Sequence, residues 1–390
     1  MAWLILQIFF WITGAFWLLA TAEMLRSILS LRHLPTLQSL PQPPPTLSVM
    51  IAVRDEATRI EKTVRQVLAQ QGVDLQLIVV NDRSRDATPQ ILSKLAQEFA
   101  QLKVITIDHL PENWLGKCHA MHVGAHYANG EWLLFTDGDV WLAPDVAARA
   151  IAAAQAMNVD HITLAPRQHM AENRQPGALY QSVMLMFGMV MNVHLGRANR
   201  DRPNSMAGIG AFNLIRKDMY EKTGGHQALR LEVADDMKLG LLVRRANPMG
   251  KSRALLAEDA VECDWAASVG GINRALEKNM WSGLNFNLPL AILLTFLLGA
   301  LWIIPFVALF YLPRPSAVLA ALGLPLLILI ASVQAAKNRW RLWPALLVPI
   351  AGPIIAGVLW NSILTTLRQG GIRWRDTFYP LSLLRSGLVR

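Results

Sequence analysis

Two aspartates separated by one glycine follow a short apolar run at residues 132–135. The run has the length and composition of a buried strand, and Asp137, Gly138 and Asp139 come directly after Thr136 at its end. Carboxylates placed in this way converge on one point, and the glycine lets the backbone approach a ligand closely. Their oxygens suit Mg²⁺ or Mn²⁺, with a phosphate-bearing substrate completing the coordination shell. An ordinary Asp-Gly turn is the structural alternative.

The region before this stretch alternates between strand and helix patterns. Apolar runs at 47–53, 75–80 and 103–107 predict strands, and helix patterns lie between them. This alternation is typical of βαβ units and a mostly parallel sheet, in which ligands bind beyond the carboxyl ends of the strands. Asp55 and Asp82 follow the first two strands. We therefore expect them to share a nucleotide-type site with the later pair of aspartates.

A second pair of acids, Asp235 and Asp236, opens a predicted helix. Acids in a first helical turn are favoured by the helix dipole, so capping is their structural explanation. Two adjacent acids beside glycine-containing loops also suit a general base, because neighbouring charges can tune its pKa. The nearby Gly208 and Gly210 permit close backbone approach to a ligand. They are not a dinucleotide fingerprint, because no third glycine opens a helix.

Composition and charge indicate a membrane protein. The apolar fraction is 53%, and the excess is concentrated at the two ends of the chain. Nine Lys/Arg and one acid lie between Phe286 and the end, so the basic balance belongs to the apolar parts and does not indicate a nucleic-acid partner. The two cysteines, Cys118 and Cys263, form no disulfide framework and fit a reducing compartment.

An apolar run from Trp3 to Ala20 is long enough to cross a bilayer. Basic residues follow this run and none precedes it, which predicts a retained anchor with the amino terminus outside and the next region in the cytoplasm. A cleaved signal peptide ending near Ala22 is the alternative. The further apolar segments are Phe286–Tyr311, Ser316–Ala336 and Leu342–Leu367.

The topology of the last apolar segment stays open. Three crossings would place the carboxy-terminal tail outside, yet the five arginines of the tail favour the cytoplasm. Prolines and glycines at 349–357 could break the segment into a re-entrant piece that returns the tail to the cytoplasmic face. Another apolar stretch, Leu179–Leu195, contains polar residues and is expected to be a helix buried in the domain or lying on the membrane surface.

Six motifs in one order resemble membrane-bound family 2 glycosyltransferases with a GT-A fold. The likeness covers residues 46–285 together with the flanking membrane segments, and the order and spacing of the motifs are more specific than any one of them. The motifs are VRDEA at 53–57, VVNDRSRDAT at 79–88, WLGKCHA at 114–120, FTDGDV at 135–140, GIGAF at 208–212 with GGH at 224–226, and ADDMKLG at 234–240.

This resemblance implies a donor site for a nucleotide sugar. Asp55 and Asp82 would hold the uracil and ribose of a UDP-linked sugar, with Glu56 nearby. Lys117 would lie near the donor diphosphate, and Asp137 would contact the ribose or a metal-bound water. The implied fold is the GT-A, or nucleotide-diphospho-sugar transferase, fold, which is Rossmann-like.

The resemblance also implies the chemistry of a hexosyltransferase. Asp139, together with Asp137, would bind Mn²⁺ or Mg²⁺, which offsets the charge that develops on the UDP leaving group. Asp236 matches the acid that deprotonates an acceptor hydroxyl, and Asp235 stands where many relatives have Glu. Which of these two acids is the base stays open. In-line attack would invert the anomeric centre.

One departure from the family bears on the acceptor. Processive and ceramide-type relatives carry a Gln/Arg-x-x-Arg-Trp motif before the carboxy-terminal helices, whereas EKNMW at 277–281 has Met280 in place of the arginine. This favours a single transfer to a membrane lipid, as in a subgroup resembling hopanoid- and carotenoid-associated transferases, over a polysaccharide synthase. The tail GIRWRDTFYP at 371–380 also resembles that subgroup. The residues expected on the acceptor side are Gly208, Gly210, Lys278 and Trp281.

The sequence thus predicts a multi-pass enzyme of the inner (plasma) membrane with a cytoplasmic catalytic domain, a nucleotide-sugar donor and a lipid acceptor. The sugar, the lipid and the oligomeric state stay open. Two alternatives are a nucleotidyltransferase of the same fold and a non-enzymatic nucleotide-binding membrane component. A rival zinc site would involve Cys118, His119, His122 and His126 on one predicted helix. Zinc binding needs a third convergent ligand and partners that orient the ligands, no HExxH motif is present, and the alanine and glycine neighbours indicate packing.

The expected parts of the chain follow from these assignments. They are a transmembrane anchor at 1–25, a Pro-rich linker at 26–45, a GT-A catalytic domain at 46–285, transmembrane helices at 286–367 and a basic tail at 368–390.

Overall fold

The computed structural model of the chain describes residues 2–169, 176–246, 249–311 and 321–389. The contacts within it divide the chain into two compact units, each built from three separate stretches. The helical unit consists of Met1–Ser30, Asn173–Gly196 and Ser268–Gly370. The sheet unit consists of Leu31–Glu172, Arg197–Ala267 and Gly371–Arg390.

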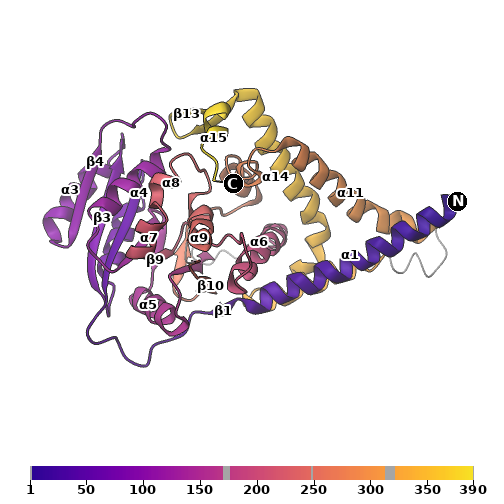
Figure 1. Ribbon diagram of the computed structural model, residues 1–390, viewed down its shortest axis with the longest axis horizontal. Coiled ribbons are helices and arrows are strands. Elements are labelled where there is room, and N and C mark those ends of the chain that lie inside the picture. The colour runs from indigo at the N-terminus through magenta and orange to yellow at the C-terminus, as the bar shows by residue number, and fades with distance from the viewer. Residues whose placement is uncertain (1, 170–175, 247–248, 312–320, 390) are drawn as a thin grey trace. The chain divides into compact units, whose positions relative to one another are not determined.

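An eight-stranded sheet is the centre of the sheet unit (Figure 1). The strand order is β1-β10-β7-β9-β5-β2-β3-β4, and of these eight strands β9 alone runs antiparallel to its neighbours. The predicted mostly parallel sheet is therefore confirmed. The strands are β1 (Arg32–His33), β2 (Thr46–Val53), β3 (Asp74–Asp82), β4 (Leu102–Ile107), β5 (Trp132–Asp137), β7 (His161–Ala165), β9 (Asn213–Arg216) and β10 (Ser252–Leu256).

Helices cover both faces of this sheet. Along β2, Val49 and Ile51 pack into one apolar core with α2, α3 and α5, whereas Met50 packs into a second core with α4, α7 and α9. Burial on both faces explains why the strands read as continuous apolar runs. The helices of this unit are α2 (Ile60–Leu68), α3 (Thr88–Glu98), α4 (Gly116–His126), α5 (Val146–Met157), α7 (Lys217–Lys222), α8 (Gly225–Ala228), α9 (Asp235–Arg245) and α15 (Leu381–Ser386).

Two small sheets complete the sheet unit. The first joins β6 (Val140–Leu142), β11 (Val261–Cys263) and β8 (Arg167–Gln168), and the second is the hairpin of β12 (Gly371–Trp374) and β13 (Thr377–Pro380). The first small sheet fixes the loop between β5 and β6, because the backbone N–H of Asp264 donates to the backbone oxygen of Asp139 at 3.0 Å. The Asp-Gly-Asp segment is thereby held at both of its ends.

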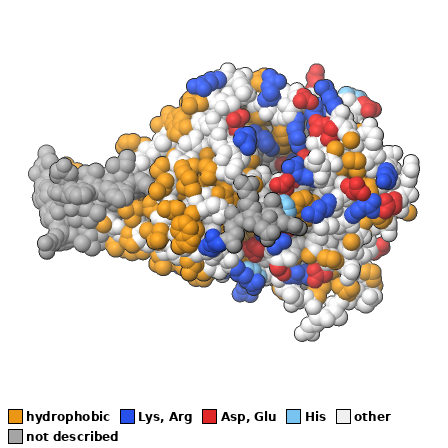
Figure 2. All heavy atoms as spheres, turned by 180° about the vertical axis from the view of Figure 1, so that it is seen from behind, with side chains coloured by type: hydrophobic (Ala, Val, Ile, Leu, Met, Phe, Trp, Pro, Cys, Tyr) orange, Lys and Arg blue, Asp and Glu red, His pale blue; other side chains and the backbone are white. Residues whose placement is uncertain are grey.

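The helical unit carries the apolar segments of the chain. Exposed apolar side chains gather on it, whereas charged side chains gather on the sheet unit (Figure 2). Its helices are α1 (Ala2–Ser30), α6 (Ala178–Asn199, whose last three residues belong to the sheet unit), α10 (Val269–Leu276), α11 (Leu288–Tyr311), α13 (Gly323–Lys337) and α14 (Val348–Gln369), with 3₁₀ turns at Ser282–Leu284 and Trp343–Leu347.

Three helices of the described chain are long and apolar enough to cross a membrane. They are Gln7–Ser30, Ala178–Asn199 and Trp343–Gln369. The second of these is the stretch that the sequence predicted to be buried or to lie on a membrane surface. The expected segment at 316–336 begins outside the described residues. The re-entrant break considered at 349–357 is absent from the described residues, because α14 continues through Pro353 as one helix.

Candidate active site

The register of the parallel strands aligns the acids that follow them. Asp137 at the end of β5 pairs with Ala52 of β2, and Val53 of β2 pairs with Asn81 of β3. Residues that follow these strands therefore emerge at one edge of the sheet, as expected for a ligand site in such a fold. Asp82 and Asp139 both lie at this edge, as the sequence predicted.

Asp55 and Asp82 are each fixed by neighbouring residues. Asp55 has a φ of 56°, and its carboxylate accepts a hydrogen bond from the backbone N–H of Arg85 at 2.7 Å. The buried carboxylate of Asp82 accepts two hydrogen bonds from Arg83, at 2.7 and 3.0 Å. Left-handed backbone at a residue with a side chain costs free energy and is found most often at functional positions.

Glu56 is largely buried beside two arginines. Its carboxylate lies 3.2 Å from Nη1 of Arg59 and 2.6 Å from Nη2 of Arg375. Arg59 also pairs with Asp264 at 2.8 Å, which ties the end of β2 to the loop after β11. The sequence predicted Glu56 at the site, but not the two arginines.

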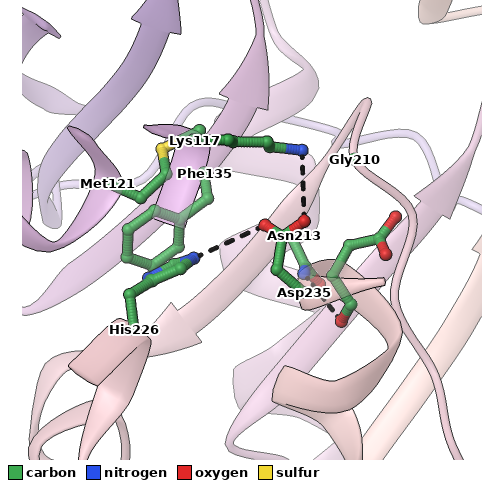
Figure 3. A pocket seen from close by; sticks show the side chains of 8 residues that line it. Lys117, Met121, Phe135, Gly210, Asn213, His226 and Asp235 are labelled. Carbon is green, nitrogen blue, oxygen red and sulfur yellow. Dashed lines mark hydrogen bonds and ion pairs between the residues drawn. The ribbon is translucent and has the colours of Figure 1, made fainter. Parts of the chain in front are cut away.

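Lys117 connects the two pairs of acids, and Figure 3 shows its ammonium beside Asp235. It is the second residue of α4, and its Nζ lies 2.9 Å from Oδ1 of Asp137 and 3.6 Å from Oδ1 of Asp235. Burial disfavours the ammonium, but the charges of Asp137, Asp235 and Asp236 outweigh burial and hold the pKa of Lys117 well above its usual value. Lys117 is therefore a permanent cation at this site.

The environment of Asp139 suits a divalent cation. Burial raises the pKa of Asp139 to about 7, and the charges of Asp137 and Glu56 add to this effect, with Arg59 opposing it. A bound cation would relieve the repulsion among these carboxylates. Among the described residues, no group of three Asp, Glu, His or Cys is placed to hold a metal ion by itself. Asp137 and Asp139 would offer two carboxylates, the kind of ligand that Mg²⁺ shares with substrate phosphate.

Asp235 and Asp236 occupy the first turn of α9 but have different surroundings. The Asp235 side chain is buried between Lys117 and His226, whose Nε2 lies 3.8 Å from Oδ2 of Asp235. Asp236 is partly exposed, and its Oδ1 accepts a hydrogen bond from the N–H of Met237 at 2.8 Å. Burial and the charge of Asp235 raise the pKa of Asp236 to about 6, against the opposing charge of Lys117. Asp236 can therefore hold or release a proton near neutral pH.

His226 is a residue of the site that the sequence reasoning did not assign. Burial lowers its pKa, so the imidazole is neutral although it faces Asp235. Its Nδ1 lies 3.0 Å from the hydroxyl of Tyr220, which also accepts a hydrogen bond from the backbone N–H of His226. We assign the ring proton to Nε2, because the Tyr220 hydroxyl can then donate to Nδ1. The GGH motif at 224–226 is the sequence signal that could have pointed to this residue.

The two loop glycines pack against the site backbone and side chains. A Cβ on Gly208 would overlap the carbonyl oxygen of Asp236, and a Cβ on Gly210 would overlap a carboxylate oxygen of Asp137. Gly210 lines the same pocket as Asn213, whose side-chain amide donates to the backbone oxygen of Asp236 at 3.2 Å (Figure 3). The glycines thus permit close approach of the acids, and their role toward an acceptor stays a prediction.

The other predicted residues lie elsewhere in the chain. Lys278 and Trp281 belong to the helical unit, where the buried Trp281 ring packs edge-on against Phe286 at 5.5 Å. Their acceptor-side role stays a prediction. Of the histidines considered for zinc, His119 and His122 pack against the ring of Trp114, at 5.3 and 5.0 Å.

A family model now identifies this domain. Residues 48–224 match the model described as Glycosyl transferase family 2. The chain therefore carries a family 2 glycosyltransferase domain, as the motifs predicted, and this domain and its relatives support a transferase.

The curated relatives include lipid-related and carotenoid-related transferases. The chain is 25% identical over 209 residues to 4,4'-diaponeurosporenoate glycosyltransferase of Staphylococcus haemolyticus, an alignment that covers 51% of this chain and 52% of that protein. It is 29% identical over 104 residues to Beta-monoglucosyldiacylglycerol synthase of Trichormus variabilis, which covers 26% of this chain and 22% of that protein. The chain thus spans about half, or less, of the length of these relatives.

A solved structure shares the fold. The mannosyltransferase PcManGT from Pyrobaculum calidifontis, determined in complex with GDP-Man and Mn²⁺, superposes with a TM-score of 0.50. The match covers 90% of this chain and 98% of that one at 17% sequence identity. At this identity the likeness shows the fold alone, and it confirms the predicted GT-A-like α/β class.

Proposed function

We propose that this chain transfers a sugar from a UDP-linked donor to a lipid in the membrane, with inversion at the anomeric carbon and with Mn²⁺ or Mg²⁺ as cofactor. The observation that carries this proposal is the position of Lys117 between Asp137 and Asp235, at the sheet edge where the other acids emerge. The lipid-related names among the relatives and the apolar helices of the chain support the class of acceptor.

On the donor side, the fixed acids after β2 and β3 would bind the nucleoside. Asp55, Glu56 and Asp82 offer carboxylates to the base and the ribose, and their own partners hold them in place. Lys117 supplies the charge for the diphosphate, and Asp137 orients the Lys117 ammonium at 2.9 Å. Because the site is partly buried, these charges act in a medium that screens them less than water does.

The carboxylates of Asp139 and Asp137 would hold the metal. When bound, the cation offsets the negative charge that develops on the nucleoside diphosphate leaving group. The raised pKa of Asp139 supports this assignment, because a group that binds protons readily among like charges also gains from binding a cation.

On the acceptor side, Asp236 would act as the general base. Its carboxylate takes the proton of the acceptor hydroxyl as the oxygen attacks the anomeric carbon, and the raised pKa increases its basicity. Asp235, held between Lys117 and His226, positions the first turn of α9. A single base on the side opposite the leaving group is the arrangement that inversion requires.

The proposal includes the location of the enzyme. The chain would lie in the inner (plasma) membrane as a multi-pass protein, with an anchor at 1–25, a linker at 26–45, a cytoplasmic catalytic domain at 46–285, membrane helices at 286–367 and a tail at 368–390. Basic residues after the first apolar run support this orientation.

The test is a panel of radiolabelled UDP- and GDP-sugars incubated with membranes that contain the protein. We expect one UDP-sugar to label material that partitions into the organic phase, and EDTA to stop the reaction. Membranes containing the Asp236→Asn protein are the control for endogenous transfer. Release of pyrophosphate from a nucleoside triphosphate and a sugar phosphate, with no transfer from any nucleotide sugar, would overturn the proposal in favour of a nucleotidyltransferase. Tight nucleotide binding without transfer to any lipid would overturn it in favour of a non-enzymatic component.

A further inference from the structure

The last strands of the sheet unit form a hairpin of residues 371–380, here called the tail hairpin. Trp374 pairs with Thr377, so the connecting turn consists of Arg375 and Asp376 alone. Two-residue hairpin turns with a positive φ at the first turn residue favour glycine at that position. Arg375 has a φ of 54°, a conformation that is costly for a residue with a side chain. The chain thus maintains a strained turn that carries two charged side chains.

Both charged side chains of the turn bind residues that follow β2. Nη2 of Arg375 lies 2.6 Å from Oε1 of Glu56, and Oδ2 of Asp376 lies 3.1 Å from Nη2 of Arg54. The Glu56 and Arg54 side chains are only 11% and 10% exposed, so solvent screens these pairs less than ordinary surface pairs. Arg375 itself is 46% exposed, which leaves it accessible to a ligand.

Tyr379 extends from β13 to the start of α4. Its hydroxyl accepts a hydrogen bond from the N–H of Gly116 at 3.1 Å, and its side chain is buried. A Cβ on Gly116 would overlap a carboxylate oxygen of Asp82, so the three residues are in close contact. Tyr379 therefore lies where the elements that carry Lys117 and Asp82 meet.

The end of the tail is fixed at a second place in the sheet unit. The N–H of Val389 donates to the carboxylate of Glu232, and the carbonyl of Val389 accepts from the ammonium of Lys238. Both side chains are buried. Glu232 and Lys238 flank the first turn of α9 in sequence, so the tail contacts the elements on both sides of the proposed site.

We propose that the turn of the tail hairpin and Tyr379 form a wall of the donor site, in which Arg375 contacts the diphosphate of the nucleotide sugar and Tyr379 positions Gly116 and Lys117. The inference rests on the proposed function. An arginine that pairs with a carboxylate can exchange it for a phosphate, because its planar group matches both anions. Glu56 is not left unpaired by this exchange, since Arg59 remains 3.2 Å away.

The test compares two arginines of the same hairpin in the full-length protein. Arg375→Gln removes the proposed donor contact. Arg373→Gln removes an equal charge from an exposed position of β12, for which the structure records no ion pair with a described residue. Binding of UDP and of GDP is measured by titration calorimetry with Mn²⁺ present. We expect Arg375→Gln to weaken UDP binding about tenfold or more and Arg373→Gln to change it by less than about twofold.

A second variant isolates the positioning role. Tyr379→Phe keeps the buried ring and removes only the hydroxyl. We expect it to raise the donor KM about fivefold, because loss of the hydrogen bond to Gly116 displaces the neighbouring Lys117. The KM for the acceptor should change little. A rise in both KM values, or in neither, would overturn the role of Tyr379.

The outcomes separate this inference from the function on which it rests. Equal UDP affinity of the two arginine variants, with the parental protein binding UDP, would overturn the inference alone. If the hairpin had only a structural role, Arg375→Gln would lower the unfolding temperature and leave the affinity for UDP unchanged. If the parental protein bound neither UDP nor GDP, the proposed donor class would be wrong. The proposed role of Arg375 would then be wrong as well.

Discussion

The site contains two pairs of acids that share one lysine but differ in their other neighbours. Asp137 and Asp235 contact Lys117 at 2.9 and 3.6 Å. Their companions, Asp139 and Asp236, have raised pKa values, because burial and the adjacent carboxylate both disfavour ionisation. In each pair one acid contacts the lysine, and the other has a carboxyl group with a raised pKa.

The pairs differ in the local structure that holds the second acid. Asp139 lies near Glu56 as well as Asp137, in a loop that Asp264 fixes, so three carboxylates repel one another there. Asp236 lies in a helical turn, where Asp235 and Asp137 repel its charge and Lys117 offsets part of the repulsion, as Arg59 does at Asp139. In the function proposed above, the acid in the loop binds a divalent cation and the acid in the helical turn binds a proton. The same residue type thus acquires two roles from its neighbours.

The largest effect should separate the two members of the α9 pair. Asp236→Asn removes the proposed base, and we expect kcat to fall about 10³-fold, whereas Asp235→Asn should cost about tenfold. The neutral side chain should not destabilise the fold, since a carboxyl with a raised pKa is one whose ionised form the fold disfavours. Single-turnover rates with the natural donor check this, together with thermal unfolding. Equal losses for the two variants would show that the pair acts as a unit without a distinct base.

The next largest effect should appear at the β5 pair and in the metal requirement. We expect Asp139→Asn to raise the Mn²⁺ concentration needed for half-maximal activity about 100-fold or more, and Asp137→Asn to raise it about tenfold. We expect the difference because Asp137 already pairs with Lys117 at 2.9 Å. Metal titrations of activity measure both values. A metal requirement unchanged in Asp139→Asn would contradict the assignment.

Removing the shared lysine should change the pH dependence. Asp236 must be ionised to act as a base, so kcat/KM at saturating metal should fall as the pH drops below about 6 in the parental protein. In Lys117→Met the opposing charge is lost, the pKa of Asp236 rises further, and the acidic limb should move upward by about one pH unit. Rates measured from pH 5 to 9 test this direction. A limb that stayed in place would show that Lys117 does not act on the base.

The smallest effect should follow changes at His226. His226→Gln retains a donor toward Asp235, so we expect kcat to fall only about fivefold. Because the imidazole is neutral, its replacement should leave the acidic limb of the pH profile where it was. A pH profile of the variant beside that of Lys117→Met makes the comparison direct. A shift of the limb in His226→Gln would mean that the ring carries charge in the working enzyme.

The strand-end acids could be predicted because their positions depend on local sequence. A buried parallel strand appears as an apolar run, and the fold places the residues after such runs at one edge. Asp82 and Asp137 were therefore found without any tertiary information. Lys117 was found only through the resemblance, because no local pattern states which side chains a lysine at a helix start will meet.

The contacts of the carboxy-terminal tail could not be predicted from the sequence. Arg375 and Tyr379 lie in a basic segment after an apolar helix. Such a segment is typical of the region that flanks a membrane-spanning helix. Their partners, Glu56 and Gly116, are hundreds of residues earlier in the chain. A contact between segments so far apart depends on how the whole unit packs, for which a single sequence carries no local signal.

The sequence by itself determined the class of sheet, the edge at which the acids emerge and the apolar character of the flanking segments. These features follow from hydrophobic periodicity and strand direction, which depend on residues close together in the sequence. Only the tertiary structure decided which acid of each pair meets Lys117, that His226 lies beside Asp235, and that the tail hairpin reaches Glu56 and Gly116. These features depend on distances between distant segments, and the charge and burial that result from those distances raise the pKa of Asp139 and of Asp236.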